Sequence, residues 1–188
     1  ALPIFGSCTY DFYGADRHGS NLYANTLIAL DAKTGKRLWH YQMIHHDLWD
    51  LDEVSAPQLV TVMHDGKKTD VVAHAGKNGF LWVFNRVTGE PLWPIEEKPV
   101  PQTDVPGEWS SATQPFPTMP PPFARQSFTV DDVNPWLAPT PEALADFKAR
   151  VAKAKNRPGP QGGLYNPPGV GVEAISMPGN QGGSNWGT

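Results

Sequence analysis

Thr34-Gly35-Lys36-Arg37-Leu38-Trp39 and Thr88-Gly89-Glu90-Pro91-Leu92-Trp93 are two copies of one pattern, 54 residues apart. Each copy follows a short apolar run, at residues 27–31 and 81–85, and therefore predicts two antiparallel strands joined by a Thr-Gly turn. A fixed internal repeat of strands and turns is typical of propellers and solenoids. The alternative is that two unrelated hairpins share a turn by chance, but the Leu-Trp match continues beyond the turn, which favours a repeat.

The segment between the two copies completes a larger unit. Residues 58–75 contain two further apolar stretches, separated by the turn His64-Asp65-Gly66-Lys67. Together with the second copy they predict four short antiparallel strands over residues 58–95, which is the content of one propeller blade. We expect Trp39 and Trp93 to insert between neighbouring blades and to bury their large rings there. The sequence thus predicts an all-β fold containing about two four-stranded blades.

The region after the second copy differs in composition. Residues 94–139 hold eleven prolines and show little periodicity, so no helix can run there. Scattered aromatic residues favour an ordered excursion between blades over a disordered linker. The run Thr140-Pro141-Glu142 predicts the start of one surface helix over residues 141–155, with its threonine as the N-cap. Beyond a Gly- and Pro-rich loop, residues 172–178 predict a strand.

Composition restricts the class of protein. The 188 residues have a formal net charge of −4 with interspersed signs, which does not suggest a nucleic-acid partner or an anionic membrane surface. The single cysteine, Cys8, excludes an internal disulfide and a multi-cysteine metal site. No apolar run has the length of a membrane span. The chain begins at Ala1 without methionine, and its 20 prolines and 18 glycines leave little material for a core, so we expect a piece of a longer polypeptide.

The stretch richest in reactive side chains is His45-His46-Asp47-Leu48-Trp49-Asp50. Two imidazoles and two carboxylates are the atom types of a metal site. Adjacent histidines on an extended chain point to opposite faces, however, and are poorly placed to bind one ion together. The stretch could also have a structural role, with its carboxylates bonding the backbone of their own loop. The residues alone leave catalysis, metal binding and a structural role open.

Several motifs resemble those of the pyrroloquinoline quinone (PQQ)-dependent dehydrogenases, and within that family the membrane-bound glucose dehydrogenase-like branch. The resemblance covers nearly the whole chain and involves residues 11–17, 39–50, 76–79, 97–102 and 113–116. It implies an eight-bladed β-propeller with the quinone on its axis. This chain would supply roughly two central to late blades, and the remaining propeller blades of the parent chain would complete the ring.

The resemblance also implies a reaction, the oxidation of a primary or secondary alcohol or an aldose sugar by hydride transfer to PQQ. Asp50, at the end of the motif, would be the general base that removes the hydroxyl proton. Lys77, 27 residues later, would donate to the ortho-carbonyl oxygens of the quinone and stabilise the negative charge that develops there. Without the resemblance, a lysine in a Lys-Asn-Gly turn would be interpreted as an ordinary exposed turn residue.

Other cofactor and pocket residues follow from the same resemblance. Asn180, Asn185 and Trp186 lie in a Gly-rich segment similar to the family loop that reaches the cofactor with an asparagine side chain. Which of the two asparagines does so stays open. The residues expected to shape the pocket and orient the base are His46, Asp47 and Trp49.

The resemblance implies a metal ion, Ca2+ or Mg2+, beside the quinone. Its expected ligands in this chain are Ser7 and Asp50. Many family members have an asparagine where this chain has Ser7, and a hydroxyl is a weaker ligand for a hard cation than an amide oxygen. The substitution puts the coordination of the metal at this position in question.

The expected partners are an alcohol or sugar substrate and a quinone or cytochrome electron acceptor. The resemblance implies a periplasmic location, with or without an inner-membrane anchor outside this stretch. The alternative is a non-catalytic propeller scaffold or envelope assembly protein, because the Thr-Gly-x-x-Leu-Trp repeat is structural in both classes. Asp50 together with Lys77 favours the enzyme. A third hypothesis, a His/Asp metallohydrolase, predicts metal-dependent hydrolysis without a quinone.

On this interpretation the chain is one partial propeller domain with five parts. They are an active-site loop at 1–26, the end of one blade with the catalytic loop at 27–57, one full blade at 58–96, a Pro-rich insertion at 97–170 that includes the helix, and the start of the next blade at 171–188.

Overall fold

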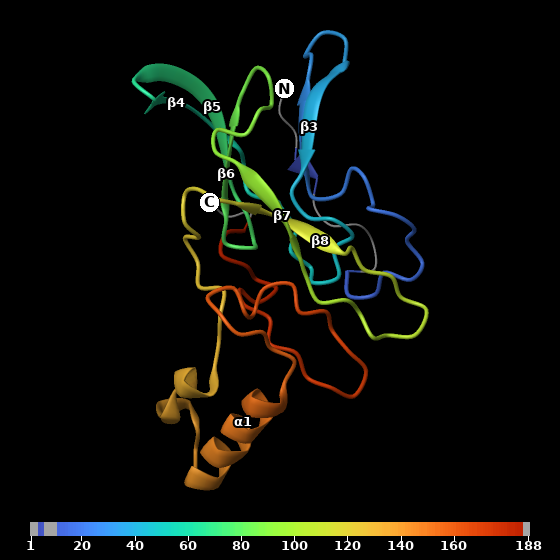
Figure 1. Cartoon of the computed structure of the whole chain (residues 1–188), viewed down its shortest axis with the longest axis vertical. Coiled ribbons are helices and arrows are strands. Elements are labelled where there is room, and N and C mark those ends of the chain that lie inside the picture. Colours follow the sequence, from blue (N-terminus) through green and yellow to red (C-terminus); the bar gives the residue numbers. More distant parts are fainter. Residues whose placement is uncertain (1–3, 6–10, 186–188) are drawn as a thin grey trace.

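The computed structural model describes residues 4–5 and 11–185. The described chain contains eight β-strands, two short 3-10 helices and one α-helix. The strands form three antiparallel sheets, in the orders β1-β2-β3, β4-β5-β6 and β7-β8. Figure 1 shows the sheets in the upper part of the molecule and the helices at its lower end. The all-β architecture agrees with the prediction from the repeat.

The first sheet contains β1 (Ile4–Phe5), β2 (Thr26–Leu30) and β3 (Arg37–Gln42). The turn between β2 and β3 is the first Thr-Gly turn. The carboxylate of Asp31 accepts hydrogen bonds from two backbone amides of this turn, at 3.0 and 2.8 Å. Asn85 does the same with its side-chain oxygen in the second copy, at 2.9 and 3.1 Å. The sequence repeat is therefore also a structural repeat.

The second sheet contains β4 (Gln58–His64), β5 (Lys67–Ala75) and β6 (Leu81–Asn85). The fourth strand predicted for this blade is reduced, in the described structure, to a single bridge between Phe84 and Pro91. Proline has no N–H to donate to a ladder, whereas the first copy has an arginine at this position and forms a strand of six residues. The second sheet therefore has three strands instead of the expected four.

Trp39 lies between the first and second sheets, as predicted. Its side chain is buried, and its ring packs against Phe84 with a centroid distance of 6.1 Å. Its Nε1 donates to the carbonyl of Arg86 at 3.3 Å. A Cβ on Gly89 would lie 2.6 Å from the indole, so the second Thr-Gly turn fits directly against this ring. Trp93, the equivalent residue of the second copy, is only half-buried.

The third sheet was not predicted. It pairs β7 (Ile95–Pro99) with β8 (Thr113–Pro117) inside the proline-rich region. Prolines argue against a central strand, but a two-stranded sheet has only edge strands, where a missing N–H can face away from the partner. Gln114 and Phe116 of β8 are buried and attach this sheet to the core.

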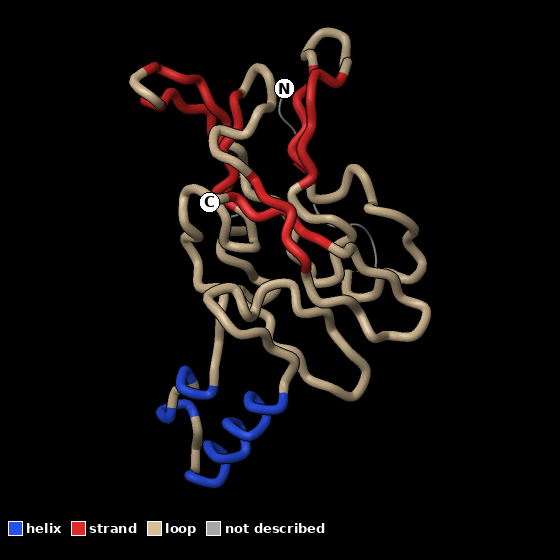
Figure 2. Tube along the Cα trace, viewed as in Figure 1, coloured by secondary structure: helices blue, strands red, loops and turns tan. Residues whose placement is uncertain are grey.

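The helices form a lobe at residues 130–153, at the lower end of Figure 2 and away from the sheets. It contains η1 (Val130–Asp132), η2 (Pro135–Leu137) and α1 (Pro141–Lys153). The two 3-10 helices lie in the region 94–139, where no helix was expected. Each has only three residues, and Pro135 stands at the start of η2, where its missing N–H is not needed. The hydroxyl of Thr140 accepts a backbone hydrogen bond at the start of α1, as expected for the N-cap. Among the described residues, no helix has the length and apolar character needed to cross a membrane.

The last part of the described chain, residues 155–185, is mainly loop and returns to the body of the molecule (Figure 2). The strand predicted over residues 172–178 is wrong for the described structure, because only Ala174 pairs there, in an isolated bridge with Lys155. A strand needs a neighbouring strand for its backbone hydrogen bonds, and none lies beside this segment in the described chain.

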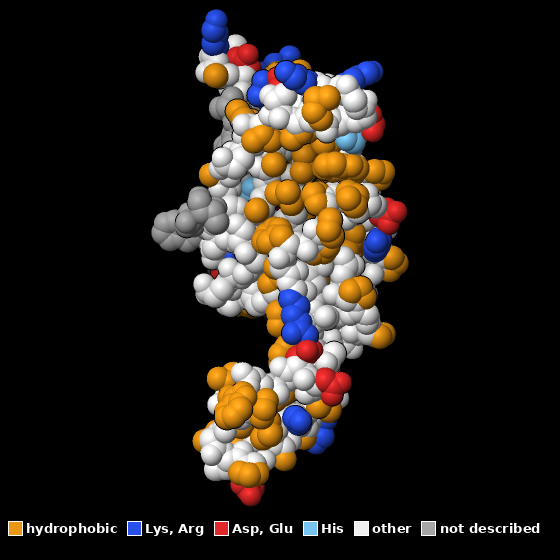
Figure 3. All heavy atoms as spheres, turned by 90° about the vertical axis from the view of Figure 1, so that its left-hand side faces the viewer, with side chains coloured by type: hydrophobic (Ala, Val, Ile, Leu, Met, Phe, Trp, Pro, Cys, Tyr) orange, Lys and Arg blue, Asp and Glu red, His pale blue; other side chains and the backbone are white. Residues whose placement is uncertain are grey.

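The hydrophobic core lies between the first two sheets and the loop that joins them. Hydrophobic side chains also gather on the outer face seen in Figure 3. On β4, Leu59 is 56% exposed and Met63 is 65% exposed. Exposed apolar patches of this kind usually mark surfaces that bind other protein segments, as expected if further blades pack beside this sheet.

Candidate active site

Residues 43–53, named here the Asp50 loop, join the first sheet to the second. Four of its apolar side chains are almost fully buried and anchor it in the core: Met43, Ile44, Leu48 and Leu51. Gln114 of β8 fixes the first part of the loop, because its Oε1 accepts from the N–H of His45 at 2.8 Å and its Nε2 donates to the carbonyl of His45 at 2.6 Å. The loop is thus held from two sides.

Asp50 and Lys77, the two residues to which the resemblance assigns chemistry, lie together in the structure. The Nζ of Lys77 donates to the backbone carbonyl of Asp50 at 3.0 Å and lies 3.6 Å from its Oδ1. The same Nζ donates to Oδ2 of Asp52 at 3.1 Å. The lysine side chain is 6% exposed, whereas the carboxylates of Asp50 and Asp52 are 19% and 24% exposed. One buried ammonium therefore bridges two carboxylates that solvent can reach.

The Asp50 carboxyl titrates unusually high. Burial raises its pKa from the usual 3.8 to about 6, and hydrogen bonding with the side chain of Asp52 adds to the rise. The positive charge of Lys77 opposes this shift by favouring the ionised form. A carboxyl with a pKa near 6 is a stronger base than an ordinary aspartate and is still mainly ionised at neutral pH.

The backbone of Lys77 is fixed by a segment distant in sequence. The N–H of Gly183 donates to the carbonyl of Lys77 at 2.8 Å. A Cβ on Gly182 would lie 2.5 Å from Cγ of Lys77, and Gly182 has a φ of +76°, so only glycine fits this close approach. The Gly-rich segment near the C-terminal end therefore packs directly against Lys77.

The two histidines do not form a metal site with Asp50. The Nε2 of His45 lies 2.9 Å from Oε1 of Glu97 on β7. The Nδ1 of His46 bonds the carbonyl of Gly19 at 2.7 Å, on the other side of the loop. Among residues 4–5 and 11–185, no three His, Cys, Asp or Glu side chains are close enough to hold a metal ion. The metallohydrolase hypothesis therefore finds no ligand cluster in the described chain.

Trp49, which belongs to the Asp50 loop, lines a cavity of about 340 Å³. Its ring is buried, and its Nε1 donates to the carbonyl of Asn166 at 2.9 Å. Phe12, Val172 and Asn180 also line this cavity. The cavity is therefore mainly apolar, with an amide side chain at its edge. Trp49, the residue immediately before Asp50, therefore forms part of the wall of this cavity.

Three predicted site residues have different outcomes near the C-terminal end. Asn180 lines the cavity beside Trp49, and the side chain of Asn185 donates to the carbonyl of Gln181 at 3.3 Å. Trp186 lies outside the described residues. Ser7, the predicted metal ligand at the other end of the chain, also lies outside them. Of the two asparagines, Asn180 is the one that the structure places at the cavity.

A buried acid and base lie behind this site and were not predicted. Oε2 of Glu53 lies 2.9 Å from Nε2 of His74 on β5, and both side chains are fully buried. The carboxylate touches the backbone of Gly76, where a Cβ would come within 2.3 Å of its oxygen. The acidic run Asp50-Leu51-Asp52-Glu53 was visible in the sequence, but its histidine partner 21 residues later gave no local indication.

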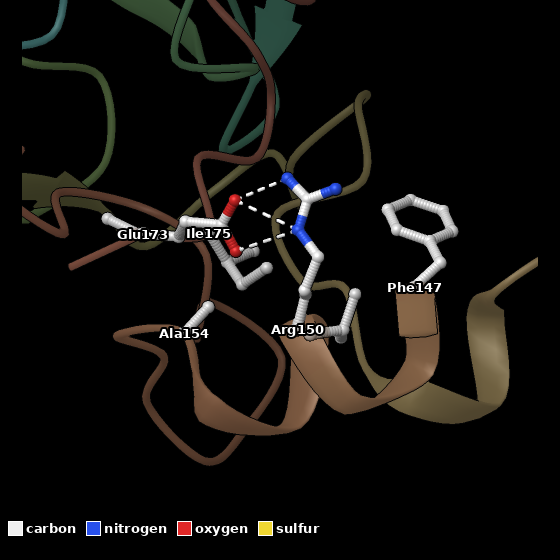
Figure 4. A pocket seen from close by; sticks show the side chains of 7 residues that line it. Phe147, Arg150, Ala154, Glu173 and Ile175 are labelled. Atoms are coloured by element: carbon white, nitrogen blue, oxygen red, sulfur yellow. Dashed lines mark hydrogen bonds and ion pairs between the residues drawn. The ribbon is translucent and has the colours of Figure 1, made fainter. Parts of the chain in front are cut away.

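A second pocket, of about 360 Å³, lies beside α1 (Figure 4), and neither Asp50 nor Lys77 lines it. Arg150 on the helix donates through Nε to the two carboxylate oxygens of Glu173, at 3.1 and 3.3 Å. Phe147 and Ile175 line the same pocket. The ion pair occupies the polar side of this pocket and links α1 to the loop of residues 155–185.

Residues 2–188 match the family model described as PQQ, the glucose/ethanol/alcohol dehydrogenase β-propeller domain. The chain belongs to this family. The predicted resemblance and the all-β propeller fold are therefore confirmed, and the fold fits the antiparallel sheets and the tryptophan that packs between them.

Named relatives of known activity are similar over the whole chain. The quinate/shikimate dehydrogenase (quinone) of Acinetobacter baylyi is 38% identical over 100% of this chain and 22% of its own length. The quinoprotein glucose dehydrogenase of Escherichia coli is 34% identical over 99% of this chain and 22% of its own length. This chain thus spans about a fifth of the length of these relatives.

Among solved structures, the quinohemoprotein alcohol dehydrogenase of Comamonas testosteroni is 29% identical over 61% of this chain and 17% of its own, with a TM-score of 0.43.

Proposed function

We propose that the full-length protein carrying this chain oxidises an alcohol or aldose sugar with PQQ as its cofactor, and that Asp50 is the general base. Membership of the PQQ β-propeller family supports the cofactor. The observation that carries the assignment within this chain is the contact between Asp50 and the buried Lys77. A scaffold would not need a solvent-accessible carboxylate beside a buried ammonium.

The side chains present are suited to hold PQQ. Lys77 offers a buried ammonium whose backbone is fixed by Gly183, and the amide of Asn180 lies at the edge of the neighbouring cavity. Such donors match the carbonyl oxygens and carboxylates of an anionic quinone. When bound, PQQ supplies the acceptor for the hydride of the substrate C–H bond. Lys77 stabilises the negative charge that this transfer places on the quinone oxygens.

Asp50 acts on the substrate hydroxyl. As the C–H bond releases its hydride, the O–H proton passes to the carboxylate of Asp50, and the substrate oxygen becomes a carbonyl oxygen. The raised pKa of Asp50, about 6, makes it a better proton acceptor than an ordinary aspartate. Lys77 keeps it ionised before the transfer, because the ammonium lies 3.6 Å from Oδ1.

A metal ion is the second proposed cofactor, either Ca2+ or Mg2+. Asp50 offers hard carboxylate oxygen, which both ions prefer. The described residues do not supply a complete ligand set, so the other ligands would come from Ser7 and from the rest of the full-length protein. No step of the reaction is assigned to the metal.

The substrate is proposed to be a ring or chain alcohol of the kind named for the relatives. The Acinetobacter baylyi enzyme is named for quinate and shikimate and for a quinone, and the Escherichia coli enzyme is named for glucose. We propose the same class of polyhydroxylated substrate here, with a quinone or cytochrome as the final electron acceptor. The periplasm is the proposed location.

The test uses the full-length protein loaded with PQQ and Ca2+ or Mg2+. Dye reduction is followed with quinate, shikimate, glucose and glycerol as substrates. Asp50→Asn is expected to lower kcat by about 10²–10⁴-fold, which is the usual contribution of a general base. PQQ affinity should remain close to that of the parent, because the variant retains Lys77.

Asp31→Asn is the matched control. Asp31 accepts the turn hydrogen bonds of the first repeat, and an asparagine already fills this role in the second repeat. The control should reduce the dye as fast as the parent. Equal rates for Asp50→Asn and the parent would refute the base assignment, and a parent that reduces no dye with any substrate would favour the scaffold.

A further inference from the structure

Asn25, at the start of the first sheet, is a buried polar residue that the reaction itself does not use. Its side chain is fully buried, and its backbone has a φ of +46°, in the left-handed region that asparagine tolerates better than most residues. Its carbonyl accepts from the N–H of Met43 at 2.8 Å, where the Asp50 loop begins. Asn25 therefore lies directly against this loop.

The side chain of Asn25 contacts the Asp50 loop at two points. Its Nδ2 donates to Oδ2 of Asp47 at 2.9 Å. Its Oδ1 accepts from the N–H of Glu53 at 3.2 Å. All of these groups are buried. One amide thus ties together two positions that stand on either side of Asp50.

Asp47 transmits this contact to the residues next to the base. Its Oδ1 accepts from the N–H of Trp49 at 2.8 Å, and its Oδ2 accepts from the N–H of Leu51 at 3.0 Å. These two amides belong to the residues immediately before and after Asp50. Asp50 itself has a φ of +56°, a conformation that a non-glycine residue keeps only when its surroundings enforce it. By accepting these two hydrogen bonds, the carboxylate of Asp47 helps to hold the backbone of Asp50 in this conformation.

We propose that Asn25 is a positioning residue for the reaction, acting through Asp47 to hold the backbone at Asp50 so that its carboxylate faces Lys77 and the substrate. This inference rests on the proposed role of Asp50 as the base. Its physical basis is that the Asn25 amide donates to Oδ2 of Asp47, the oxygen that also accepts from Leu51, and so holds the carboxylate in the orientation in which Oδ1 accepts from Trp49. A displacement of a reacting group by about 1 Å can cost about 10²-fold in rate.

The test is Asn25→Asp in the full-length, PQQ-loaded protein. Aspartate keeps the size of asparagine and an oxygen for the N–H of Glu53, but it replaces the donor with a second carboxylate oxygen facing Asp47. Repulsion between the two carboxylates should shift the loop. We expect kcat to fall by about tenfold to hundredfold, with KM and PQQ affinity within about twofold of the parent.

Asn85→Asp is the matched control. The same substitution falls in the second Thr-Gly turn, where the side chain accepts from the amides of Val87 and Thr88 and an aspartate serves equally well in the first turn. This variant should keep the kcat of the parent. A kcat loss in Asn25→Asp without one in Asn85→Asp places the effect at the Asp50 loop.

A double variant gives a second readout that simple destabilisation would not produce. Asn25→Asp with Asp47→Asn reverses the donor and the acceptor, so the contact between positions 25 and 47 can form again. Recovery should be partial, because the amide of Leu51 loses its oxygen acceptor. We expect kcat several-fold above that of either single variant; a double variant as slow as the slower single one would overturn the inference.

Two outcomes separate this inference from the proposed base. If Asn25→Asp keeps the parent kcat while Asp50→Asn loses activity, the positioning role is wrong and the base stands. If Asp50→Asn is fully active, the base is wrong and the positioning role falls with it. Should Asn25→Asp fail to fold, Asn25→Gly keeps the positive φ and removes both contacts. An unchanged kcat in that variant, or equal losses in kcat, KM and PQQ affinity, would overturn the inference.

Discussion

Two acid–base pairs join the Asp50 loop to the end of β5, and they differ in their exposure to solvent and in the number of their contacts. Lys77 meets Asp50 and Asp52 through three oxygen atoms, and both carboxylates are partly exposed. His74 meets Glu53 through one hydrogen bond in a fully buried setting. Solvent can reach the carboxylates of the first pair, whereas the second pair is closed to solvent.

One loop thus carries both an accessible acidic group, Asp50, and a fully buried one, Glu53. A buried ion pair loses the hydration of both partners, so its net contribution to stability is small even when its geometry is good. Breaking it is nevertheless costly, because the remaining partner stays buried alone. We therefore expect Glu53 and His74 to act on stability, and Asp50 and Lys77 to act mainly on catalysis.

The largest expected effect on stability is that of His74→Leu. This change leaves the Glu53 carboxylate fully buried without its hydrogen-bond partner, and Oε1 of Glu53 already has no partner in the described structure. We expect the free energy of unfolding of the full-length protein to fall by about 3–5 kcal/mol. Chemical unfolding monitored by tryptophan fluorescence measures the free energy of unfolding of the variant and of the parent. Residual activity per folded molecule should stay near that of the parent.

The double variant Glu53→Leu, His74→Leu is the control for this change. Replacing both partners of a buried pair with apolar groups is often neutral or stabilising, because no charge remains to be buried. Most of the stability lost in the single variant should therefore return. A double variant as unstable as the single one would show that the lost packing of the imidazole, and not the unpaired carboxylate, causes the effect.

Lys77→Met should have the next largest effect, and it should appear in activity. The variant keeps the length of the side chain but removes the ammonium that contacts Asp50 and that we propose to stabilise the quinone. We expect kcat/KM to fall by about 10²–10³-fold, as when one electrostatic donor is removed from other active sites. Stability should change less than in His74→Leu, because water can reach both carboxylates that lose their partner. Dye reduction and unfolding are measured on the same preparations.

Lys77→Arg is its control, since arginine retains the positive charge. It should keep a larger part of the activity than the methionine variant. If Lys77→Met instead left kcat/KM unchanged and destabilised the protein as much as His74→Leu, the two pairs would not differ in the way proposed.

The sequence predicted those parts of the fold that depend on neighbours in the chain. The two Thr-Gly turns could be predicted because Asp31 and Asn85 bond amides only two and three residues away. The burial of Trp39 could also be predicted, because the repeat implied a second turn for it to pack against. The β7-β8 sheet could not, because its prolines suggest irregular chain and its pairing depends on 13 intervening residues.

The site was predictable only where the motif itself contains the residue. Asp50 and Lys77 came from the family resemblance, whereas their direct contact at 3.6 Å is seen only in the folded chain. Asp52 is the nearer carboxylate to Lys77, yet nothing in the sequence distinguishes it from the other acids in the loop. Asn25 was missed because its contacts with Asp47 and Glu53 span 22 and 28 residues, and only the folded loop brings them together.

The smallest expected effect is a change in how stability depends on pH, and it again separates the two pairs. Burial raises the pKa of the Glu53 carboxyl above its usual 4.5, although the hydrogen bond from His74 works against this shift. The folded protein therefore holds a proton on Glu53 at pH values where the unfolded chain has released it. The resulting contribution to stability is complete below pH 4.5 and is lost as the pH rises through the higher pKa of the folded state.

Glu53→Gln removes this titration. As the pH rises from about 4.5, the parent should lose stability relative to the variant, so the unfolding midpoint of the variant should rise relative to that of the parent. Unfolding curves recorded for both proteins over this pH range measure the change in midpoint. Glu96→Gln on β7 is the matched control, because the Glu96 side chain is 54% exposed and pairs with Lys98 at the surface. If the midpoint difference between Glu53→Gln and the parent did not change with pH, Glu53 would be charged in the folded protein over this range. The same conclusion would follow if the midpoint difference for Glu96→Gln changed with pH as steeply. The Glu53–His74 pair would then differ less from the pair formed by Lys77 and Asp50.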